Sequence, residues 1–238
     1  MNKLILILAM FLASVLFAKA SPSDWGKSVR GNGHVTQQDR PLASFDGIKA
    51  SAGINVFLFA GDEEKVVVEA DENLQECIIT EVKGSTLKCY IDCRVRKSTK
   101  MNVYVTFREL NLLHASSGSD VTGETPIKTR ELDINVSSAA DLKVEVIAES
   151  IECDASSGAD ARIKGKAAHF RGRSSSGADI KADELTVETA DVKSSSGADI
   201  RITVTGKIEA DASSGGDVVY FGDPRYERVH ESSGGDVT

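Results

Sequence analysis

The chain has 238 residues, with 28 Lys and Arg against 36 Asp and Glu, which gives a formal net charge of −8 at pH 7. This acidic balance argues against nucleic acid or an anionic membrane surface as a partner, because both attract Lys and Arg rather than carboxylates. Aromatic residues make up 5% of the chain, so the aromatic faces that line many sugar-binding clefts are scarce.

The first twenty residues have the pattern of a secretory signal. A basic start at Lys3 leads into an apolar run over 4–18, broken by Ser14, and a small-x-small sequence precedes Ser21. A run of this length is too short to cross a bilayer comfortably. We therefore predict a signal peptide at 1–20 and a mature chain without a transmembrane segment; the alternative is a membrane anchor that stays uncleaved. Because the signal contains two Lys and no acidic residue, the mature charge falls to −10.

Residues 21–40 are predicted as an N-terminal linker and residues 41–238 as one continuous domain, irregular over 41–115 and repetitive over 116–238. In the irregular half, alternating apolar stretches such as 54–58 and 101–107 are separated by turn residues and predict strands. Residues 71–74 favour one short helical turn. The sequence Ser51-Ala52-Gly53-Ile54-Asn55 looks like a degenerate copy of a motif that recurs downstream, so we expect the first half to join the same stack.

The four cysteines are Cys77, Cys89, Cys93 and Cys153. Their spacing matches no zinc motif, and an oxidising compartment permits a disulfide without specifying which cysteines pair. Cys89 and Cys93 fall in an alternating run in which every second residue points the same way. This pattern favours buried thiols that serve as small hydrophobic groups.

From residue 116 onward a five-residue motif, Ser-Ser-Gly-x-Asp with small variations, recurs seven times. The copies open at Ser116, Ser137, Ser156, Ser175, Ser195, Ser213 and Ser232, with separations of 21, 19, 19, 20, 18 and 19 residues. Apolar residues alternate with polar ones around each copy, for example over 151–163 and 192–204, which marks strands with one buried face.

A unit of about nineteen residues cannot enclose a core alone, so it buries its apolar face by stacking on its neighbours. The predicted fold is all-β: a single-stranded, right-handed parallel β-helix, or β-solenoid, with coils of roughly 19 residues. Alternation continued through the motif places the second Ser and the residue before Asp inward, and the first Ser, the Gly and the Asp outward. The central Gly suggests a bend with φ > 0, which would shift that count by one. Ala139 replaces this Gly in the second copy.

These pieces together resemble a known family. The run from Phe45 to Ile48, the Gly53-Ile54-Asn55 tripeptide, the segments 66–69, 71–74 and 87–90, and the downstream serine-glycine repeats resemble the head GIN domain family of auto-transporter adhesins. The order of the pieces covers residues 40 to 238, almost the whole mature chain. The resemblance implies an exported β-helix of a Bacteroidetes-type bacterium, and it implies adhesion by name only.

The strongest chemical pattern is one Asp per repeat, at Asp120, Asp141, Asp160, Asp179, Asp199, Asp217 and Asp236. Carboxylates stacked about 4.8 Å apart would repel one another by roughly 1 kcal/mol even in bulk water. Two residues after four successive Asp stand basic residues on the same face, Lys143, Arg162, Lys181 and Arg201. We predict that the two sets form a structural ladder of cross-strand charge pairs. The alternative is a calcium ion held by carboxylates of adjacent coils, which the neighbouring basic residues oppose.

No catalytic residue, metal site or cofactor site is predicted. A nucleophilic serine needs a positioned base, and among His34, His114, His169 and His230 only His114 and His230 lie within a few residues of a motif. We therefore expect the serines to form hydrogen-bonded ladders at the turns. The aromatic cluster Tyr220, Phe221 and Tyr226 is expected to form a loop that covers the last coil.

The sequence thus predicts a non-catalytic, exported binding or structural module in the periplasm or on the outer cell surface. Its expected partner is a macromolecule such as an envelope glycan or another protein, and the terminal coil offers a surface for self-association. The alternative is a carbohydrate-active β-helix enzyme, a polysaccharide hydrolase or lyase with paired carboxylates in a cleft.

Overall fold

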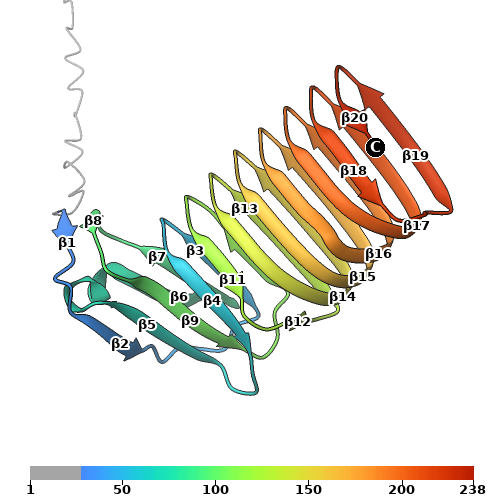
Figure 1. Ribbon diagram of the computed structural model, residues 1–238. Coiled ribbons are helices and arrows are strands. Elements are labelled where there is room, and N and C mark those ends of the chain that lie inside the picture. Colours follow the sequence, from blue (N-terminus) through green and yellow to red (C-terminus); the bar gives the residue numbers. More distant parts are fainter. Residues whose placement is uncertain (1–27) are drawn as a thin grey trace, which may run out of the picture.

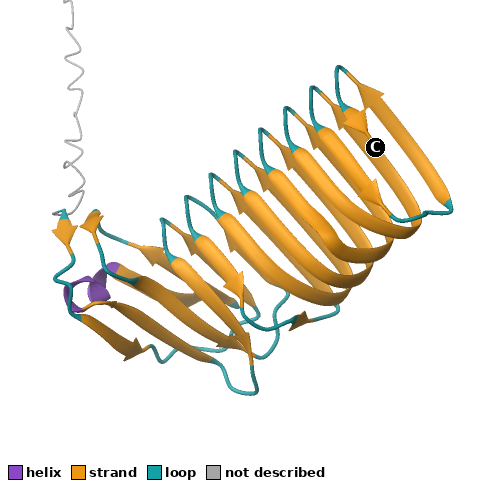
Figure 2. Ribbon diagram, in the orientation of Figure 1, coloured by secondary structure: helices purple, strands orange, loops and turns teal. Residues whose placement is uncertain are grey.

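Each Ser-Ser-Gly-x-Asp motif forms a tight turn, and the strand that follows bends once around the body before it reaches the next turn. The computed structural model describes residues 28–238 and shows these coils stacked into one solenoid (Figure 1). Four consecutive long strands, β14 (Asp141–Ser156), β15 (Asp160–Ser175), β16 (Asp179–Ser195) and β17 (Asp199–Ser213), pair in parallel. The turns line up along one edge (Figure 2). The predicted all-β parallel β-helix is confirmed, and the predicted signal at 1–20 lies outside the described residues.

The flattened solenoid has two broad faces. The front face carries β9 (Met101–Phe107), β4 (Asn55–Ala60), β11 (Asp120–Gly123), the first halves of β14–β17, β18 (Asp217–Phe221) and β20 (Asp236–Val237). From β11 onward these strands begin at a motif Asp. The back face carries the strands that precede the turn: β7 (Thr86–Ile91), β3 (Gly47–Ser51), β10 (Leu112–Ala115), β13 (Glu131–Ser137), the second halves of β14–β17 and β19 (Tyr226–Ser232). The short strand β12 (Ile127–Lys128) pairs with β14 where β14 bends.

The turn has two successive residues in the left-handed region. Ser157 and Gly158 have φ of 56° and 67°, and the other copies repeat this pair. Positive φ at both central positions is the geometry of a type I′ turn, closed for example by the Ala178 amide donating to the Ser175 carbonyl at 3.3 Å. The predicted left-handed Gly is confirmed.

The predicted inward position of the second Ser is wrong. Because both central residues are left-handed, the alternation breaks there, and Ser157 is exposed while Ala159 is buried. The outward positions of the first Ser, the Gly and the Asp agree with the prediction. Turns of adjacent coils are joined directly, since the Gly158 amide donates to the Ser176 carbonyl at 3.1 Å.

The degenerate motif at 51–55 joins the stack as expected. Ala52 and Gly53 are left-handed, and Asn55 pairs in register with Asp120. The chain then leaves the stack to build an N-terminal cap and returns at β10. In the cap, β5 (Lys65–Asp71) pairs antiparallel with β9 and with β2 (Val35–Asp39), and β6 (Ile78–Lys83) pairs antiparallel with β7.

The remaining cap elements close the end of the core. A 3₁₀ helix, η1 (Glu72–Cys77), begins one residue after the predicted helical turn begins and buries Leu74. The pair β1 (Val29–Arg30) and β8 (Val95–Lys97) lies beside it. Strands β1 and β2 fall within the segment 21–40 that the sequence predicts as a linker, so part of that segment is ordered and belongs to the cap.

The core is filled by residues that complement one another in size from coil to coil. The inward column Ile151, Phe170, Ala190 and Ile208 places a large ring between smaller neighbours. A Cβ at Gly172, two residues after Phe170, would lie 2.6 Å from that ring. The column therefore leaves no room for a larger side chain at Gly172.

The last coil is not covered by the aromatic cluster, so that prediction is wrong. Tyr220 and Phe221 end β18, and Tyr226 begins β19 with 71% of its surface exposed. The inward positions of β19 instead carry Glu227, Val229 and Glu231, in register with the buried Ile208, Ala210 and Ala212 of the preceding coil. The cluster forms the bend of the last coil because the chain turns there toward β19. Inward charges at an edge disfavour the addition of another strand.

The cysteines divide into one disulfide and two buried thiols. Cys77 and Cys93 form a disulfide that joins the end of η1 to the loop before β8. Cys89 and Cys153 are fully buried and unpaired. The prediction of a buried thiol is thus confirmed for Cys89 and wrong for Cys93, because the strand β7 ends at Ile91 and the alternation stops before Cys93.

The native protein is expected to show no reactive thiol. Burial raises the pKa of Cys89 to about 12, and burial, with help from nearby Asp154, also raises the pKa of Cys153. Titration with Ellman's reagent should therefore detect no thiol in the native protein, two after unfolding and four after unfolding with reduction. Detection of four thiols in the unfolded, unreduced protein would contradict the disulfide.

Ala139 is expected to be a stability defect. It occupies the left-handed Gly position of the turn with φ of 57°, where a Cβ costs roughly 1–2 kcal/mol and Gly costs less. Ala139→Gly should raise the free energy of unfolding by about 1 kcal/mol, and Gly158→Ala should lower it by a similar amount. Urea denaturation measures both variants, and shifts of the same sign would refute the turn geometry.

Candidate binding surface

The motif carboxylates form a straight row along the front face, here called the Asp row. Each pairs in register with the Asp of the adjacent coil, from Asp120 through Asp141, Asp160, Asp179, Asp199 and Asp217 to Asp236. The same row continues toward the cap through Asn55 and Asn102. In the Gly53-Ile54-Asn55 tripeptide, Ile54 is buried and Asn55 stands in this row. The tripeptide therefore forms the end of the turn and the start of the strand in one coil.

Like charges in the row disfavour ionisation. Burial, the charge of Asp141 and a hydrogen bond with Asp141 raise the pKa of Asp120. Burial and the charges of Asp179 and Asp217 raise the pKa of Asp199, although Lys181 and Arg201 oppose the shift. Carboxylates directly opposite on adjacent strands are destabilising, so the row needs compensation.

A second row stands two residues along each strand. Lys143, Arg162, Lys181 and Arg201 pair in register across β14–β17, and are here called the basic row. Lys181 Nζ lies 2.5 Å from Asp160 Oδ1 and 2.9 Å from Asp179 Oδ2. Burial lowers the pKa of Lys181, but hydrogen bonds to these two carboxylates outweigh it and raise the pKa overall. Lys181 is therefore a bridge between two coils of the Asp row.

The other three basic residues lie beside the Asp row without such a bridge. Within residues 28–238, Lys143, Arg162 and Arg201 have no carboxylate oxygen within 4.0 Å of a charged nitrogen. The Arg201 guanidinium instead lies over the Phe221 ring, 5.9 Å from its centroid. The structure thus brings one of the four predicted counter-charges into direct contact with the Asp row and leaves three available to solvent or a ligand.

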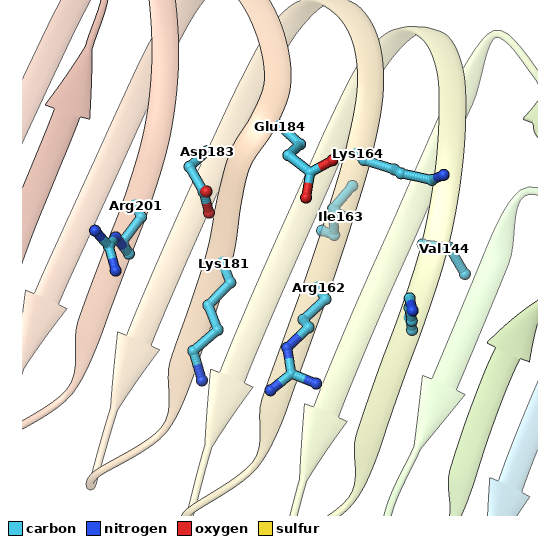
Figure 3. Close-up of a pocket in the computed structure, with 9 residues that line it drawn as sticks. Val144, Arg162, Ile163, Lys164, Lys181, Asp183, Glu184 and Arg201 are labelled. Atoms are coloured by element: carbon cyan, nitrogen blue, oxygen red, sulfur yellow. The ribbon is translucent and has the colours of Figure 1, made fainter.

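The basic row borders an open hollow of about 300 Å³ with Val144 and Ile163 in its lining (Figure 3). Asp183 and Glu184 lie on the side of the hollow away from the ends of Arg162 and Lys181 (Figure 3). The pairing register of β16 shifts between Ala182 and Thr186, so Asp183 and Glu184 belong to a β-bulge. Bulges aim side chains out of the regular alternation, and this one supplies carboxylates on the side of the hollow opposite the ends of Arg162 and Lys181, where Lys164 also lies (Figure 3).

The basic row continues toward the cap with aromatic side chains. Thr122 follows Lys143, and Phe57 and Tyr104 follow Thr122. The two rings stack with centroids 5.3 Å apart and an interplanar angle of 21°, and the Tyr104 hydroxyl donates to Glu69 at 2.8 Å. Sequence reasoning missed this pair, although the alternation that follows Asn55 places Phe57 two residues on, just as Lys143 stands two residues after Asp141.

Serine hydroxyls support the turns, but they belong to other serines than the two that open each motif, which differs from the predicted ladder of motif hydroxyls. The Ser174 and Ser194 hydroxyls, one residue before a motif, donate to the Ala178 and Ala198 carbonyls at 2.7 Å and 2.5 Å. Ser119 donates to the Ala50 carbonyl of the adjacent coil at 3.2 Å. In the part of the chain that the structure describes, no three His, Cys, Asp or Glu side chains are grouped to hold a metal ion. No helix there is long and apolar enough to cross a membrane.

Comparison with known proteins identifies a family with this architecture. Residues 44–224 match a family model described as "Putative auto-transporter adhesin, head GIN domain". No protein with curated annotation matches the chain.

Several solved structures share the fold. A Bacteroides fragilis protein titled a "putative adhesin" is 21% identical with a TM-score of 0.83, over 88% of this chain and 99% of that one. A Parabacteroides distasonis protein with the same title is 24% identical with a TM-score of 0.72, over 89% and 100%. A second P. distasonis protein, titled a "Putative lipid binding protein", is 19% identical with a TM-score of 0.69, over 89% and 100%.

Removal of one charge from the Asp row is expected to stabilise the protein. Because the pKa of Asp120 is raised in the folded state, folding loses stability as pH rises from the unfolded pKa through the folded one. Asp120→Asn should therefore gain about 0.5 kcal/mol at neutral pH, a small effect because water screens the row. Near pH 3, where the unfolded carboxyl is also mostly protonated, the gain should vanish.

Thermal unfolding at both pH values measures this difference. Asp62→Asn, in an exposed loop, serves as the control and should change stability at neither pH. A loss of stability for Asp120→Asn at neutral pH would mean that the row is compensated by a group that needs the carboxylate.

Proposed function

The chain belongs to the head GIN domain family, and from this membership we propose that it is a non-catalytic binding module of the cell envelope. The observation that supports this proposal is the row of outward side chains that presents one residue per strand from Tyr104 through the basic row to Arg201. Six strand spacings of about 4.8 Å make this row about 29 Å long.

A surface that repeats once per coil fits a ligand that also repeats. We therefore propose an envelope glycan as the partner, lying along the solenoid axis on the front face. The stacked Phe57 and Tyr104 rings offer apolar surface at one end, and the three unbridged cations of the basic row offer hydrogen-bond donors at the other. A protein partner is the other outcome that the experiment below separates.

The proposed location is the periplasm or the outer cell surface. Support comes from the signal pattern of residues 1–20 and from the adhesin description of the family. Cell fractionation followed by protease treatment of intact cells distinguishes the two compartments. Recovery of the full-length chain in the cytoplasm would overturn the proposal.

Removal of the unbridged cations is expected to weaken ligand binding but not folding. The triple variant Lys143→Gln, Arg162→Gln and Arg201→Gln should bind purified envelope polysaccharide about tenfold more weakly, since three contacts of about 0.5 kcal/mol each amount to roughly that factor. Lys181 is kept because it bridges Asp160 and Asp179. Sedimentation of the protein with insoluble polysaccharide measures the affinity.

The matched control removes three exposed charges elsewhere, in the variant Lys128→Gln, Lys166→Gln and Arg225→Gln, and should bind as the native protein does. Equal loss of polysaccharide binding in both triple variants would mean that net charge, and not the basic row, causes the effect. Binding to envelope proteins in place of polysaccharide would reassign the partner class. Reproducible release of new reducing ends or unsaturated sugars would overturn the non-catalytic assignment in favour of a hydrolase or lyase.

A further inference from the structure

A second hollow, of about 360 Å³, lies on the back face near the cap. Its outward side chains come from four adjacent strands, β7, β3, β10 and β13, of which β7, β3 and β13 are labelled in Figure 1. They form two rows of four: Lys88, Lys49, His114 and Asn135 in the first, and Tyr90, Ser51, Ser116 and Ser137 in the second. We call this set the back-face hollow.

The back-face hollow is lined by cationic and neutral groups. It contains Lys49 and Lys88 and no Asp or Glu, although acidic residues outnumber basic ones in the chain. Within the described part of the chain, neither lysine has a carboxylate oxygen within 4.0 Å of Nζ. Two neighbouring cations without a partner repel each other across adjacent strands, so an anion between them would lower the free energy.

The nearest carboxylates stand outside the hollow and are partly engaged elsewhere. Glu81 is opposite Lys88 on β6, but it accepts from Lys83 at 2.7 Å and from the Tyr90 hydroxyl at 3.2 Å. Asp133 lies two residues before Asn135 on the same strand, and Asp154 is the neighbour of Asn135 on β14. None of these three acids lines the hollow.

The central coils of the back face are different, because carboxylates lie beside several of their cations. Arg173 contacts Glu152 at 3.1 Å and Asp154 at 3.7 Å, and Lys193 contacts Asp211 at 2.8 Å. On the front face Lys181 is likewise held by two carboxylates. Lys49 and Lys88 therefore lack the carboxylate contacts that Arg173, Lys193 and Lys181 have, and in this respect they resemble the unbridged front-face cations Lys143, Arg162 and Arg201.

The second row of the hollow supplies hydrogen-bond donors. Ser51, Ser116 and Ser137 stand side by side in the row beside that of Lys49, His114 and Asn135. The short Asn135 and Ser side chains leave the space that makes the hollow. Hydroxyl and amide groups beside two ammonium groups match the several acceptor oxygens of a carboxylate, sulfate or phosphate. Hydrogen bonds of this kind to an ionised group are about twice as strong as neutral ones.

We propose that the back-face hollow is an oxyanion site that takes a carboxylate, sulfate or phosphate group, with Lys49 and Lys88 as the charge partners. The anion would lie over β3 and β10, where the long side chains of Lys49 and Lys88 reach toward it from one side and His114, Ser51 and Ser116 are its neighbours. This site is separate from the front-face rows and does not depend on the proposed function.

His114 provides an independent readout of the bound anion. Burial and the charge of Lys49 lower its pKa, and Asp133 opposes the shift. Lys88 and Asn135 are the other lining groups of its row. An anion in the hollow favours the charged imidazole, so the His114 pKa should rise when the site is filled.

The experiment is a titration of the full-length mature protein with inorganic phosphate and with sulfate at constant ionic strength, followed by NMR. We expect saturable shifts confined to the amides of Ser51, His114, Ser116 and Ser137, and a rise in the His114 pKa. Lys49→Gln with Lys88→Gln should weaken binding about tenfold or abolish it. The matched control, Lys128→Gln with Lys166→Gln, should bind as the native protein does.

A uronic-acid oligosaccharide and its carboxyl-reduced counterpart distinguish a polymer-borne anion from a free one. Binding of the charged oligosaccharide at this site supports the polymer as source, and binding of phosphate or sulfate alone supports a free anion. Shifts spread over all lysine-bearing surfaces, or equal weakening in both double variants, would overturn the site. Loss of front-face binding in the basic-row variant leaves this result unchanged, so the two proposals fail separately.

Discussion

Hydrogen bonding between the peptide groups of successive coils is the constraint on which the rest of this structure depends. The Gly158 amide reaches the Ser176 carbonyl at 3.1 Å and the Asp179 amide reaches the Ala159 carbonyl at 2.9 Å, so each turn sits directly on the next. Pairing without a register change at the turn forces equivalent residues into columns. The left-handed Ser-Gly pair makes this possible, because its twist returns the chain sharply enough to begin another coil.

Columns determine both stability and surface chemistry. Inside, a large side chain needs small neighbours, as Phe170 has in Ala190 of the next coil and in Gly172 on its own strand. Outside, a charge that recurs in every coil meets its own copy about 4.8 Å away. The molecule meets this cost in different ways: Lys181 bridges two members of the Asp row, Asn55 and Asn102 replace Asp near the cap, and the back face alternates Arg, Lys and acids. Where compensation is incomplete, a surface is left that can bind a partner.

The repeat allowed much of the solenoid to be predicted from sequence, because a nearly constant period leaves little freedom in how coils align. The Asp and basic rows followed from counting, and the left-handed Gly followed from its place at the centre of the motif. The orientation of the second Ser did not, since two consecutive left-handed residues reverse alternation and Ser at positive φ is not a sequence signal. The bulge at Asp183 and Glu184 was hidden for a similar reason: one extra residue in a coil does not reveal where it is accommodated.

The N-terminal half was harder because its strands do not stack in chain order. Strand β9 pairs with β4 on the side toward the cap, and β7 pairs in the same way with β3. Phe57 therefore lies beside Tyr104 and Lys49 beside Lys88, although long loops separate these residues in the sequence. The Cys77 to Cys93 disulfide depends on the path of the same cap. No local pattern announces such contacts, and both the aromatic pair and the back-face hollow were missed.

Distance measurement along the Asp row tests the account most directly. Each variant carries one cysteine in place of Asp120 and a second in place of Asp179, Asp199, Asp217 or Asp236. Pulsed electron paramagnetic resonance measures the distance between spin labels on these two cysteines. The native Cys89 and Cys153 are buried. Stacking in register predicts distances that increase by about 4.8 Å per coil, from about 14 Å for the first pair to about 29 Å for the last. Distances that fail to rise in equal steps would contradict it.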